Sequence, residues 1–190
     1  MSNRADFVYS RIYRGPVKGL VLDWSGTTAD AYVLAPAVVF VEVFRKHGVE
    51  VSMSEARGPM GLRKDLHIKV MTEDQTIRER WRESHGTYPG QGDVERMYAD
   101  FVPMQLDCLR QYTTLLPGVA ETTQVFQKQG IKIGSTTGFV RSMVDLLEED
   151  ARKQGYVPDA TFGAGDVPRG RPFPHMVLRN IVELDVSPVQ

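Results

Sequence analysis

Short apolar runs and longer amphipathic segments alternate at both ends of the chain, and a mostly helical stretch separates these two ends. A short apolar run predicts a buried strand at residues 19–22, and two further strands are predicted at residues 131–135 and 160–162. Apolar residues at helical spacing predict helices over residues 35–47, 119–129, 141–154 and 175–184. In the last of these helices we expect Met176, Val177, Ile181 and Val182 to form the apolar side.

The middle of the chain reads as helical throughout. A short helical segment is predicted at residues 54–57 and a helix over 60–72, with Pro59 near its start. Residues 73–112 are rich in charge and in helix formers, and their apolar residues recur at helical spacing. We therefore predict a parallel α/β core formed by residues 17–34 and 113–190, a helical cap formed by 35–112, and an N-terminal lead-in over 1–16.

Composition excludes several classes of protein. A net charge of -1 gives no sign of a nucleic-acid or membrane-surface partner. Cys108 is the only cysteine, so the chain has no intrachain disulfide and no thiolate metal cluster. No apolar run approaches the roughly 20 residues that span a bilayer, and residues 1–14 lack a signal-peptide core. We expect a soluble cytoplasmic protein.

Asp23 follows the first predicted strand directly and is the first candidate for chemistry. A carboxylate at the carboxyl end of a buried parallel strand lies where open α/β sheets hold their ligands. The alternative is an Asp that only caps the following loop. Placement alone leaves these two interpretations evenly balanced.

Lys64 is the second candidate, because it interrupts an otherwise apolar face. Met60, Lys64, His67 and Met71 share one face of the helix predicted over 60–72. The methionines and the histidine fit core packing. A lysine among them would lose solvation, its pKa would fall, and the neutral amine could form a Schiff base with a carbonyl substrate. Lys64 could equally extend outward and cover the apolar face.

Five segments resemble the phosphonoacetaldehyde hydrolase family of the haloacid dehalogenase superfamily, in order and in spacing. They are Asp23-Trp24-Ser25-Gly26-Thr27-Thr28; Arg57-Gly58-Pro59-Met60-Gly61-Leu62-x-Lys64-x-x-His67; Ile131-Lys132-Ile133-Gly134-Ser135-Thr136-Thr137-Gly138; Gly155-Tyr156; and Asp166-Val167-Pro168-x-Gly170-Arg171-Pro172. The resemblance implies a Rossmann-like parallel core with a helical cap inserted after the first strand, a Mg²⁺ cofactor and a homodimer. The segment around Lys64 is its most specific part.

The resemblance also implies roles for individual residues. Asp23 would be the nucleophile toward phosphorus and a magnesium ligand, and Ser25 would give the metal its backbone carbonyl. Lys64 would form the imine, flanked by Met60 and His67, which would assist its proton transfers. The phosphoryl oxygens would be bound by Gly26, Thr27, Thr137 and Arg171. Phe139 stands where family members often have tyrosine, so one hydroxyl contact would be lost.

The implied reaction is hydrolysis of the carbon–phosphorus bond of phosphonoacetaldehyde, in phosphonate degradation. An iminium at Lys64 would accept the electron pair of that bond while Asp23 takes the phosphoryl group. Two other functions stay open. One is phosphate-ester hydrolysis, which Ser25 disfavours, because ester-cleaving members commonly carry a second Asp at that position to protonate an alkoxide. The other is a catalytically impaired module that only binds or dimerises.

In the resembled family a further strand follows the last predicted helix and supplies acidic magnesium ligands. Residues 186–190 contain no carboxylate. We therefore expect a C-terminally incomplete core, weak magnesium binding and little or no hydrolase activity in the 190-residue chain. Acetaldehyde release with magnesium measures this, and turnover near that of an intact relative would refute it.

Overall fold

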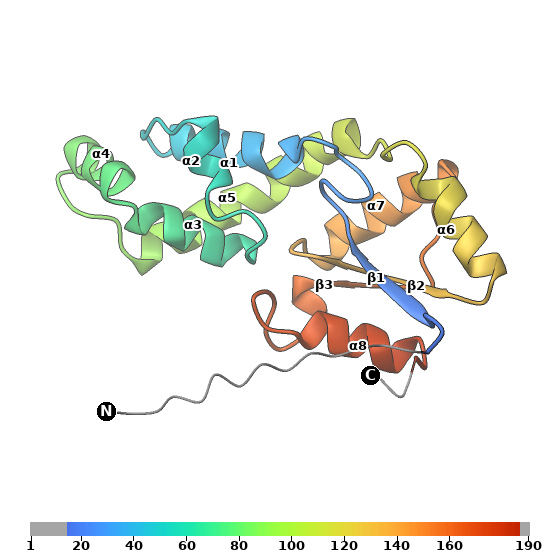
Figure 1. Cartoon of the computed structure of the whole chain (residues 1–190). Helices are drawn as coiled ribbons and strands as arrows, with labels where there is room; N and C mark the ends of the chain where they lie inside the picture. The colour runs from blue at the N-terminus through green and yellow to red at the C-terminus, as the bar shows by residue number, and fades with distance from the viewer. Residues whose placement is uncertain (1–14, 187–190) are drawn as a thin grey trace, which may run out of the picture.

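The computed structural model describes residues 15–186 and contains a parallel sheet, its flanking helices and a block of helices at one end (Figure 1). The strands are β1 (Gly19–Asp23), β2 (Lys132–Thr137) and β3 (Ala160–Gly163). They pair in the order β1-β2-β3 with all strands parallel. The register sets Asp23 beside Thr136, so polar residues end two neighbouring strands at the same edge. The three predicted strands are confirmed, with ends shifted by at most two residues.

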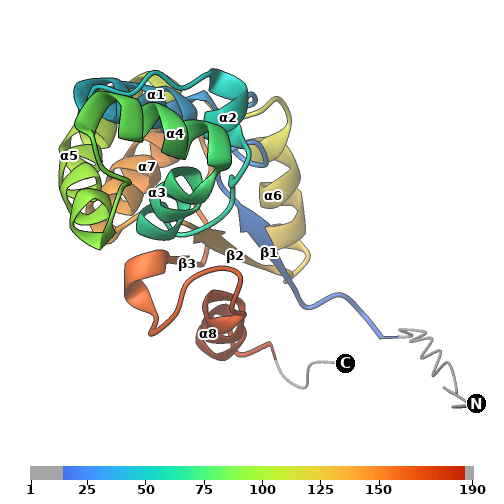
Figure 2. The same cartoon turned by 90° about the vertical axis from the view of Figure 1, so that its left-hand side faces the viewer.

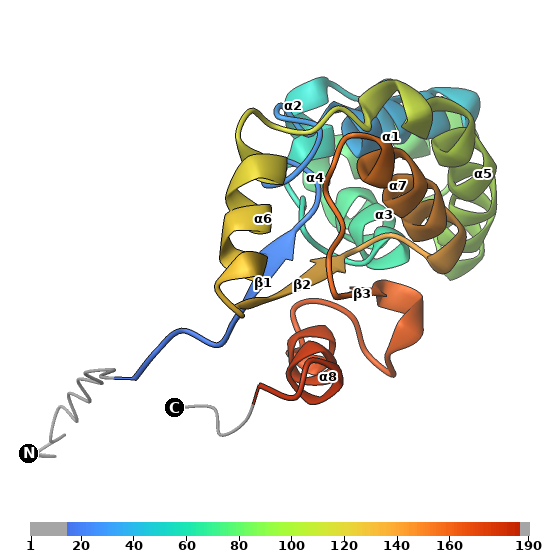
Figure 3. The same ribbon diagram turned by 90° about the vertical axis from the view of Figure 1, so that its right-hand side faces the viewer.

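Helices cover both faces of this sheet. α6 (Val119–Lys128) and α7 (Arg141–Lys153) lie on one face, and α8 (His175–Glu183) lies on the other (Figures 1 and 3). α8 lies close to β2 at Gly134, which has no side chain. A Cβ at this position would stand only 2.4 Å from Asn180 Oδ1. The Asn180 amide donates to the carbonyl oxygen of Ser135 at 3.0 Å and thereby ties α8 to the central strand.

The buried face of α8 differs from the prediction. Met176 and Asn180 are buried, whereas Val177 is half-exposed and Val182 is 80% exposed. Asn180 takes the central contact, where its amide donates to the Ser135 carbonyl of the central strand. The apolar spacing therefore located the helix and its buried Met176, but it missed Asn180 and wrongly included Val177 and Val182.

The block at the other end consists of α1 (Leu34–Lys46), α2 (Met53–Arg57), α3 (Lys64–Glu73), α4 (Gln75–His85) and α5 (Gln91–Leu109), followed by the single turn η1 (Arg110–Tyr112) (Figure 2). α1 and α3 both pack on the long helix α5. In the centre, the Phe40 ring stacks on His67 at 3.8 Å and on Phe101 at 4.5 Å between ring centroids. A helical stretch in the middle of the chain is thus confirmed.

Two segments join the block to the sheet, and they run side by side. Leu116 N–H donates to the Thr28 carbonyl at 2.9 Å, and Asp30 N–H donates to the Thr114 carbonyl at 3.1 Å. The Asp30 carboxylate accepts the N–H groups of the first turn of α1 at 2.9 and 3.0 Å. These contacts fix the position at which the helical block is attached, next to the end of β1.

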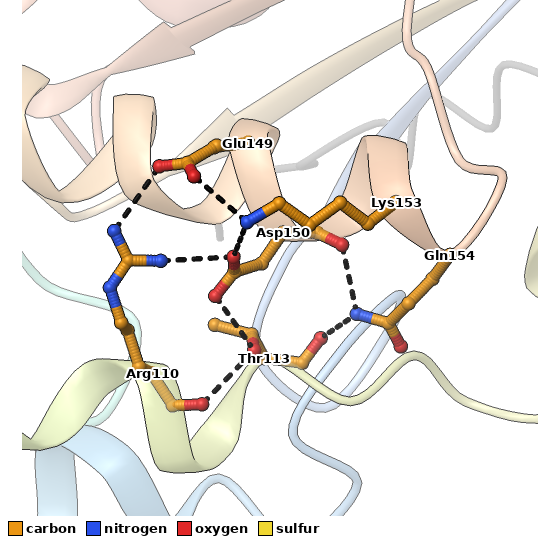
Figure 4. Close-up of polar contacts among 6 residues, drawn as sticks. All are labelled: Arg110, Thr113, Glu149, Asp150, Lys153 and Gln154. Atoms are coloured by element: carbon orange, nitrogen blue, oxygen red, sulfur yellow. Dashed lines mark hydrogen bonds and ion pairs between the residues drawn. The ribbon is translucent and has the colours of Figure 1, made fainter.

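A polar cluster fastens the returning segment to α7 (Figure 4). The Arg110 guanidinium pairs with Glu149 at 3.2 Å and with Asp150 at 3.0 Å. Gln154 Nε2 donates to the Thr113 carbonyl at 2.9 Å, and its Oε1 accepts from Leu115 N–H at 2.9 Å. The ion pairs are largely exposed and each stabilises little. The Gln154 amide is the link that holds backbone groups directly.

Gln154→Ala should lower the free energy of unfolding by about 1 kcal/mol, because two backbone groups of the returning segment lose their side-chain partner. Urea denaturation measures this loss. Gln129 has the same place at the end of α6, and no hydrogen bond of its side chain is found within residues 15–186. Equal losses in Gln129→Ala and Gln154→Ala would contradict the role given to Gln154.

Two further predictions concern the chain ends and membranes. Residues 1–14, which make up most of the predicted lead-in, lie outside the described residues. Within residues 15–186, no helix combines the length and the apolar character needed to cross a membrane.

Candidate active site

Asp23 ends β1, and the loop after it closes tightly around one carbonyl oxygen. The N–H groups of Thr27, Thr28 and Ala29 all donate to the Trp24 carbonyl at 2.9–3.1 Å. Gly26 has φ +82°, and a Cβ there would meet Val33 Cγ2 at 2.7 Å, so this position requires glycine. The loop turns the chain back at once and leaves the Asp23 carboxylate at the carboxyl end of the strand.

Arg171 contacts this carboxylate from the loop before α8. Its Nη2 lies 2.7 Å from Asp23 Oδ1 and 2.8 Å from Thr136 Oγ1. Trp24 N–H donates to the same carboxylate oxygen at 2.8 Å. The pair is partly solvated, with side-chain exposures of 26% for Arg171 and 39% for Asp23. A carboxylate and a guanidinium therefore lie in contact at a partly solvated place, where the guanidinium could also bind an anionic group.

Lys64 is buried, at 6% exposure, at the first position of α3. Its Nζ lies 5.0 Å from the Phe139 ring centroid and 5.6 Å from that of Phe40, and no hydrogen bond or ion pair of this nitrogen is found within residues 15–186. Burial lowers the pKa of Lys64 from 10.5 to about 8; the charge of Asp23 opposes this fall and the charge of Arg171 adds to it. The open question of whether Lys64 points outward is thereby settled, because this amine lies in an apolar site.

A small cavity joins Lys64 to Asp23. Its volume is about 40 Å³, which is roughly the space of one water molecule. The helical block contributes Val33, Pro36, Met60, Gly61 and Lys64 to its walls, and the sheet and its loops contribute Asp23, Ser25, Thr137, Gly138, Phe139 and Arg171. Gly138 allows this close approach, because a Cβ there would lie 3.0 Å from the Leu62 carbonyl. This space is smaller than a substrate of several heavy atoms.

The helix around Lys64 begins later than predicted. α3 starts at Lys64, and Met60 lies in the turn before it, so these two residues do not share a helical face. The bends at Gly58-Pro59 and Gly61, which has φ +98°, explain the later start. Met60 still reaches the cavity wall, by way of the turn.

His67 lies outside the cavity wall. It is fully buried, its Nε2 lies 2.9 Å from the Ala56 carbonyl, and its ring stacks on Phe40. Burial and, to a lesser extent, the charge of Lys64 lower the pKa of His67 to about 3, against the hydrogen bond to Ala56, which raises it. The ring is therefore neutral, with the proton on Nε2 and a lone pair on Nδ1, for which no partner is found within residues 15–186.

The backbone of Gly26 and Thr27 is engaged within the loop. Gly26 N–H donates to the carbonyls of Ala29 and Asp30, and Thr27 N–H donates to Trp24. Their binding of phosphoryl oxygens therefore stays a prediction. Sequence reasoning also missed Thr136, which holds Arg171, and Val33, which lines the cavity. The two threonines that end β2 were the available signal for Thr136.

The two residues expected to hold a metal in this cavity offer oxygen donors. Asp23 and Ser25 both line it, and carboxylate and carbonyl oxygens suit a hard cation such as Mg²⁺, which keeps several waters. Within residues 15–186 there is no cluster of three or more His, Cys, Asp or Glu residues that could hold a metal ion. The donors fit magnesium in kind and supply two ligands.

The chain matches no protein-family model. It is 44% identical over 184 residues to a phosphonoacetaldehyde hydrolase of Syntrophobacter fumaroxidans, covering 97% of this chain and 66% of that protein. A bifunctional phosphonoacetaldehyde hydrolase/aminoethylphosphonate transaminase of Clostridioides difficile is 44% identical over 94% of this chain and 28% of its own length. The chain thus spans 66% or less of these two relatives.

The solved structures that are similar to this chain include a protein like the same hydrolases. A phosphonoacetaldehyde hydrolase-like protein from Oleispira antarctica superposes with a TM-score of 0.90 at 39% identity, covering 96% of this chain and 66% of that one. A haloacid dehalogenase-like hydrolase from Bacteroides fragilis, at 18% identity and a TM-score of 0.66 over 90% of this chain and 74% of that one, supports the fold alone. The chain belongs to the phosphonoacetaldehyde hydrolase family and has the fold of the haloacid dehalogenase-like hydrolases.

Proposed function

We propose that the site hydrolyses the carbon–phosphorus bond of phosphonoacetaldehyde, giving acetaldehyde and inorganic phosphate. One observation carries this proposal: a buried lysine of lowered pKa shares a cavity with a carboxylate at the end of a strand. The amine of Lys64 can form an imine with the aldehyde carbon, and the carboxylate of Asp23 can accept the phosphoryl group. The names of the relatives supply the substrate.

Lys64 performs the carbon half of the reaction. At pH 7 a lysine of pKa about 8 is neutral about 300 times more often than one of pKa 10.5. The neutral amine attacks the aldehyde carbon, water leaves, and a protonated imine remains. When the carbon–phosphorus bond breaks, its electron pair moves into this iminium and forms an enamine. Protonation of the enamine at carbon and hydrolysis of the imine then release acetaldehyde and the amine.

Asp23 performs the phosphorus half. Its carboxylate oxygen forms a bond to phosphorus as the carbon–phosphorus bond breaks, and water later hydrolyses the aspartyl phosphate. Arg171, 2.7 Å from this carboxylate, offsets negative charge between two anions that must approach each other. The Thr137 hydroxyl accepts from Phe139 N–H at 3.3 Å, which leaves its own proton for a phosphoryl oxygen.

We propose that His67 accepts protons during the reactions of Lys64 and that Met60 keeps water away from its amine. His67 follows Lys64 by one turn of α3, and its Nδ1 lone pair is a proton acceptor that the low pKa keeps unprotonated at neutral pH. Met60 lines the cavity beside Lys64 and helps to keep it dry. Exclusion of water preserves the neutral amine.

Three further properties are proposed from the family resemblance. Mg²⁺ would be held by the Asp23 carboxylate and the Ser25 carbonyl, and when bound it would offset charge between carboxylate and phosphonate. A homodimer and a cytoplasmic location complete the proposal. The free thiol of Cys108 is compatible with a reducing compartment.

Ester hydrolysis within the same superfamily is disfavoured by the same residues. Departure of an alkoxide calls for a nearby acid, and the residue two positions after Asp23 is Ser25. An ester also gives a buried lysine no carbonyl to attack. Borohydride treatment separates the two functions, because only an imine becomes a permanent alkyl group on Lys64.

The rate of imine formation should follow the titration of Lys64. The neutral fraction rises with pH up to the pKa, so the rate of acetaldehyde trapping at Lys64 should climb between pH 6 and 8 and level off above about 8. Peptide mapping after cyanoborohydride reduction at each pH, with trapping at exposed Lys128 as the internal control, measures this profile. A rise that continues to pH 10.5 at Lys64 would contradict the lowered pKa.

A further inference from the structure

A second, larger cavity lies beside the site, at the boundary between the helical block and the sheet. Its volume is about 460 Å³. It is lined by residues of α3, of α5 and of the loop 169–173, and we call it the vestibule. Arg171 lines both the vestibule and the 40 Å³ cavity, so the two spaces share a wall residue.

The vestibule runs up to the residue before Lys64. A Cβ on Gly170 would lie 3.7 Å from Arg63 Cβ, which shows that the loop passes directly against the start of α3. The inner cavity is too small for phosphonoacetaldehyde, so the substrate must approach along a boundary between the block and the sheet. The vestibule is the large cavity on that boundary next to both Arg171 and α3.

Four cationic side chains line the vestibule, and three of them have acidic partners. Arg63 forms a two-pronged pair with Asp65 at 2.5 and 2.7 Å. Arg171 pairs with Asp23, and Lys69 lies 3.9 Å from Glu73.

Arg169 is the fourth cation, and no ion pair of its guanidinium is found within residues 15–186. Among the vestibule's acidic residues, Asp65 is occupied by Arg63, and Glu95 accepts from Gln91 at 3.1 Å. Within residues 15–186, Arg169 is therefore the vestibule cation for which no acidic partner is found, and Glu95, bonded to the uncharged Gln91 amide, is the vestibule carboxylate for which no cationic partner is found.

The Arg169 side chain is also held in place. Its guanidinium carbon lies 4.0 Å from the centroid of the Phe173 ring, and both residues line the vestibule. Stacking on a ring leaves the in-plane N–H groups of a guanidinium available for a planar, two-pronged contact. Phosphonate and phosphate oxygens match such a contact.

We propose that Arg169 recruits the substrate by binding its phosphonate group in the vestibule, before the group passes to Arg171 and Asp23. The substrate's identity rests on the proposed function, whereas capture of a phosphonate-like dianion rests on the vestibule itself. An arginine without an acidic partner attracts an anion to the cavity that it lines, and salt screens this attraction. Arg169 thereby sets a preference for charged over neutral aldehydes.

The test compares Arg169→Gln with wild type and with Arg152→Gln, an exposed arginine at the far end of α7 that serves as the matched control. Trapping at Lys64 is measured against the concentration of phosphonoacetaldehyde or of uncharged acetaldehyde, at low and at high salt. For Arg169→Gln at low salt we expect the half-saturating concentration of phosphonoacetaldehyde to rise about three- to tenfold. The difference should disappear at high salt, and acetaldehyde trapping should not change.

Each other result contradicts the proposal. An unchanged concentration dependence removes the role of Arg169, and an equal loss with both aldehydes or at both salt concentrations shows a merely structural effect. If wild type forms no adduct at Lys64 with either aldehyde, the proposed function fails. Titration with inorganic phosphate then decides recruitment separately: weaker binding in Arg169→Gln than in Arg152→Gln supports it, and equal binding overturns it.

Discussion

Lys64→Met should abolish reductive trapping of phosphonoacetaldehyde and lower the rate of carbon–phosphorus cleavage by at least about 10⁴-fold. Methionine has a similar length and fits between the rings of Phe40 and Phe139, so the packing of the site survives. What is lost is the nitrogen that must bond to carbon. Mass spectrometry after borohydride reduction, together with an assay of released acetaldehyde, measures both effects.

The same variant should be more stable than wild type at pH 7. The fall in the pKa of Lys64 from 10.5 to about 8 corresponds to up to about 3 kcal/mol of stability lost by burying the charged form. Between pH 8 and 10.5 the unfolded state binds more protons than the folded state, so wild-type stability rises with pH. The advantage of Lys64→Met therefore shrinks over this interval, which urea denaturation at several pH values measures.

Lys128→Ala is the matched control for Lys64→Met, because Lys128 is an exposed lysine in the last turn of α6. It should keep both trapping and cleavage. Adduct formation at wild-type level in Lys64→Met would show that the imine forms on another lysine. A large loss of stability in this variant would show that the amine is well solvated or partnered.

Asp23→Asn should separate the two halves of the reaction. Asparagine cannot accept the phosphoryl group, so cleavage should fall by about 10⁴-fold or more. Imine formation should continue, and at pH 7 it should be faster than in wild type. In wild type the charge of Asp23 raises the pKa of Lys64, and the variant lacks this charge, so more of the amine is neutral. Borohydride reduction should therefore leave a phosphonoethyl group on Lys64, with the carbon–phosphorus bond intact.

Single-turnover conditions and a scavenger of free acetaldehyde keep this experiment decisive even when turnover is slow. Asp107 is exposed on α5, and Asp107→Asn should behave as wild type. An ethyl group on Lys64 in Asp23→Asn, formed as fast as in wild type, would show that another group accepts phosphorus.

The strands and most helices could be predicted from the sequence because each has a local pattern. β1 is a short apolar run that ends in Asp23, β2 is a short segment that ends in two threonines, and α7 has a regular apolar stripe. The start of α3 could not be placed, because the bends at Gly58-Pro59 and Gly61 act within a segment whose residue spacing still looks helical. The buried face of α8 was misjudged because Asn180 is buried by one long-range hydrogen bond.

The residues of the candidate site could be predicted from sequence motifs, and hydrophobic periodicity alone did not identify them. Asp23 was visible as a carboxylate that ends a strand, but its partner Arg171 comes from a loop 148 positions later. Periodicity left two orientations open for Lys64, and the rings of Phe40 and Phe139 decide between them. No local pattern carries that information, because both rings come from other parts of the chain. The vestibule likewise exists only where α3, α5 and the loop 169–173 meet.

The most direct test of this account is the mass of the group left on Lys64 when wild-type protein is incubated with phosphonoacetaldehyde and magnesium and then reduced with borohydride. We predict an alkyl group on Lys64: a phosphonoethyl group where the carbon–phosphorus bond is intact, and an ethyl group where it has been cleaved, since the imine that remains after cleavage carries only the carbons of acetaldehyde. A Lys64 that carries no alkyl group under these conditions, in a folded protein, would contradict the account.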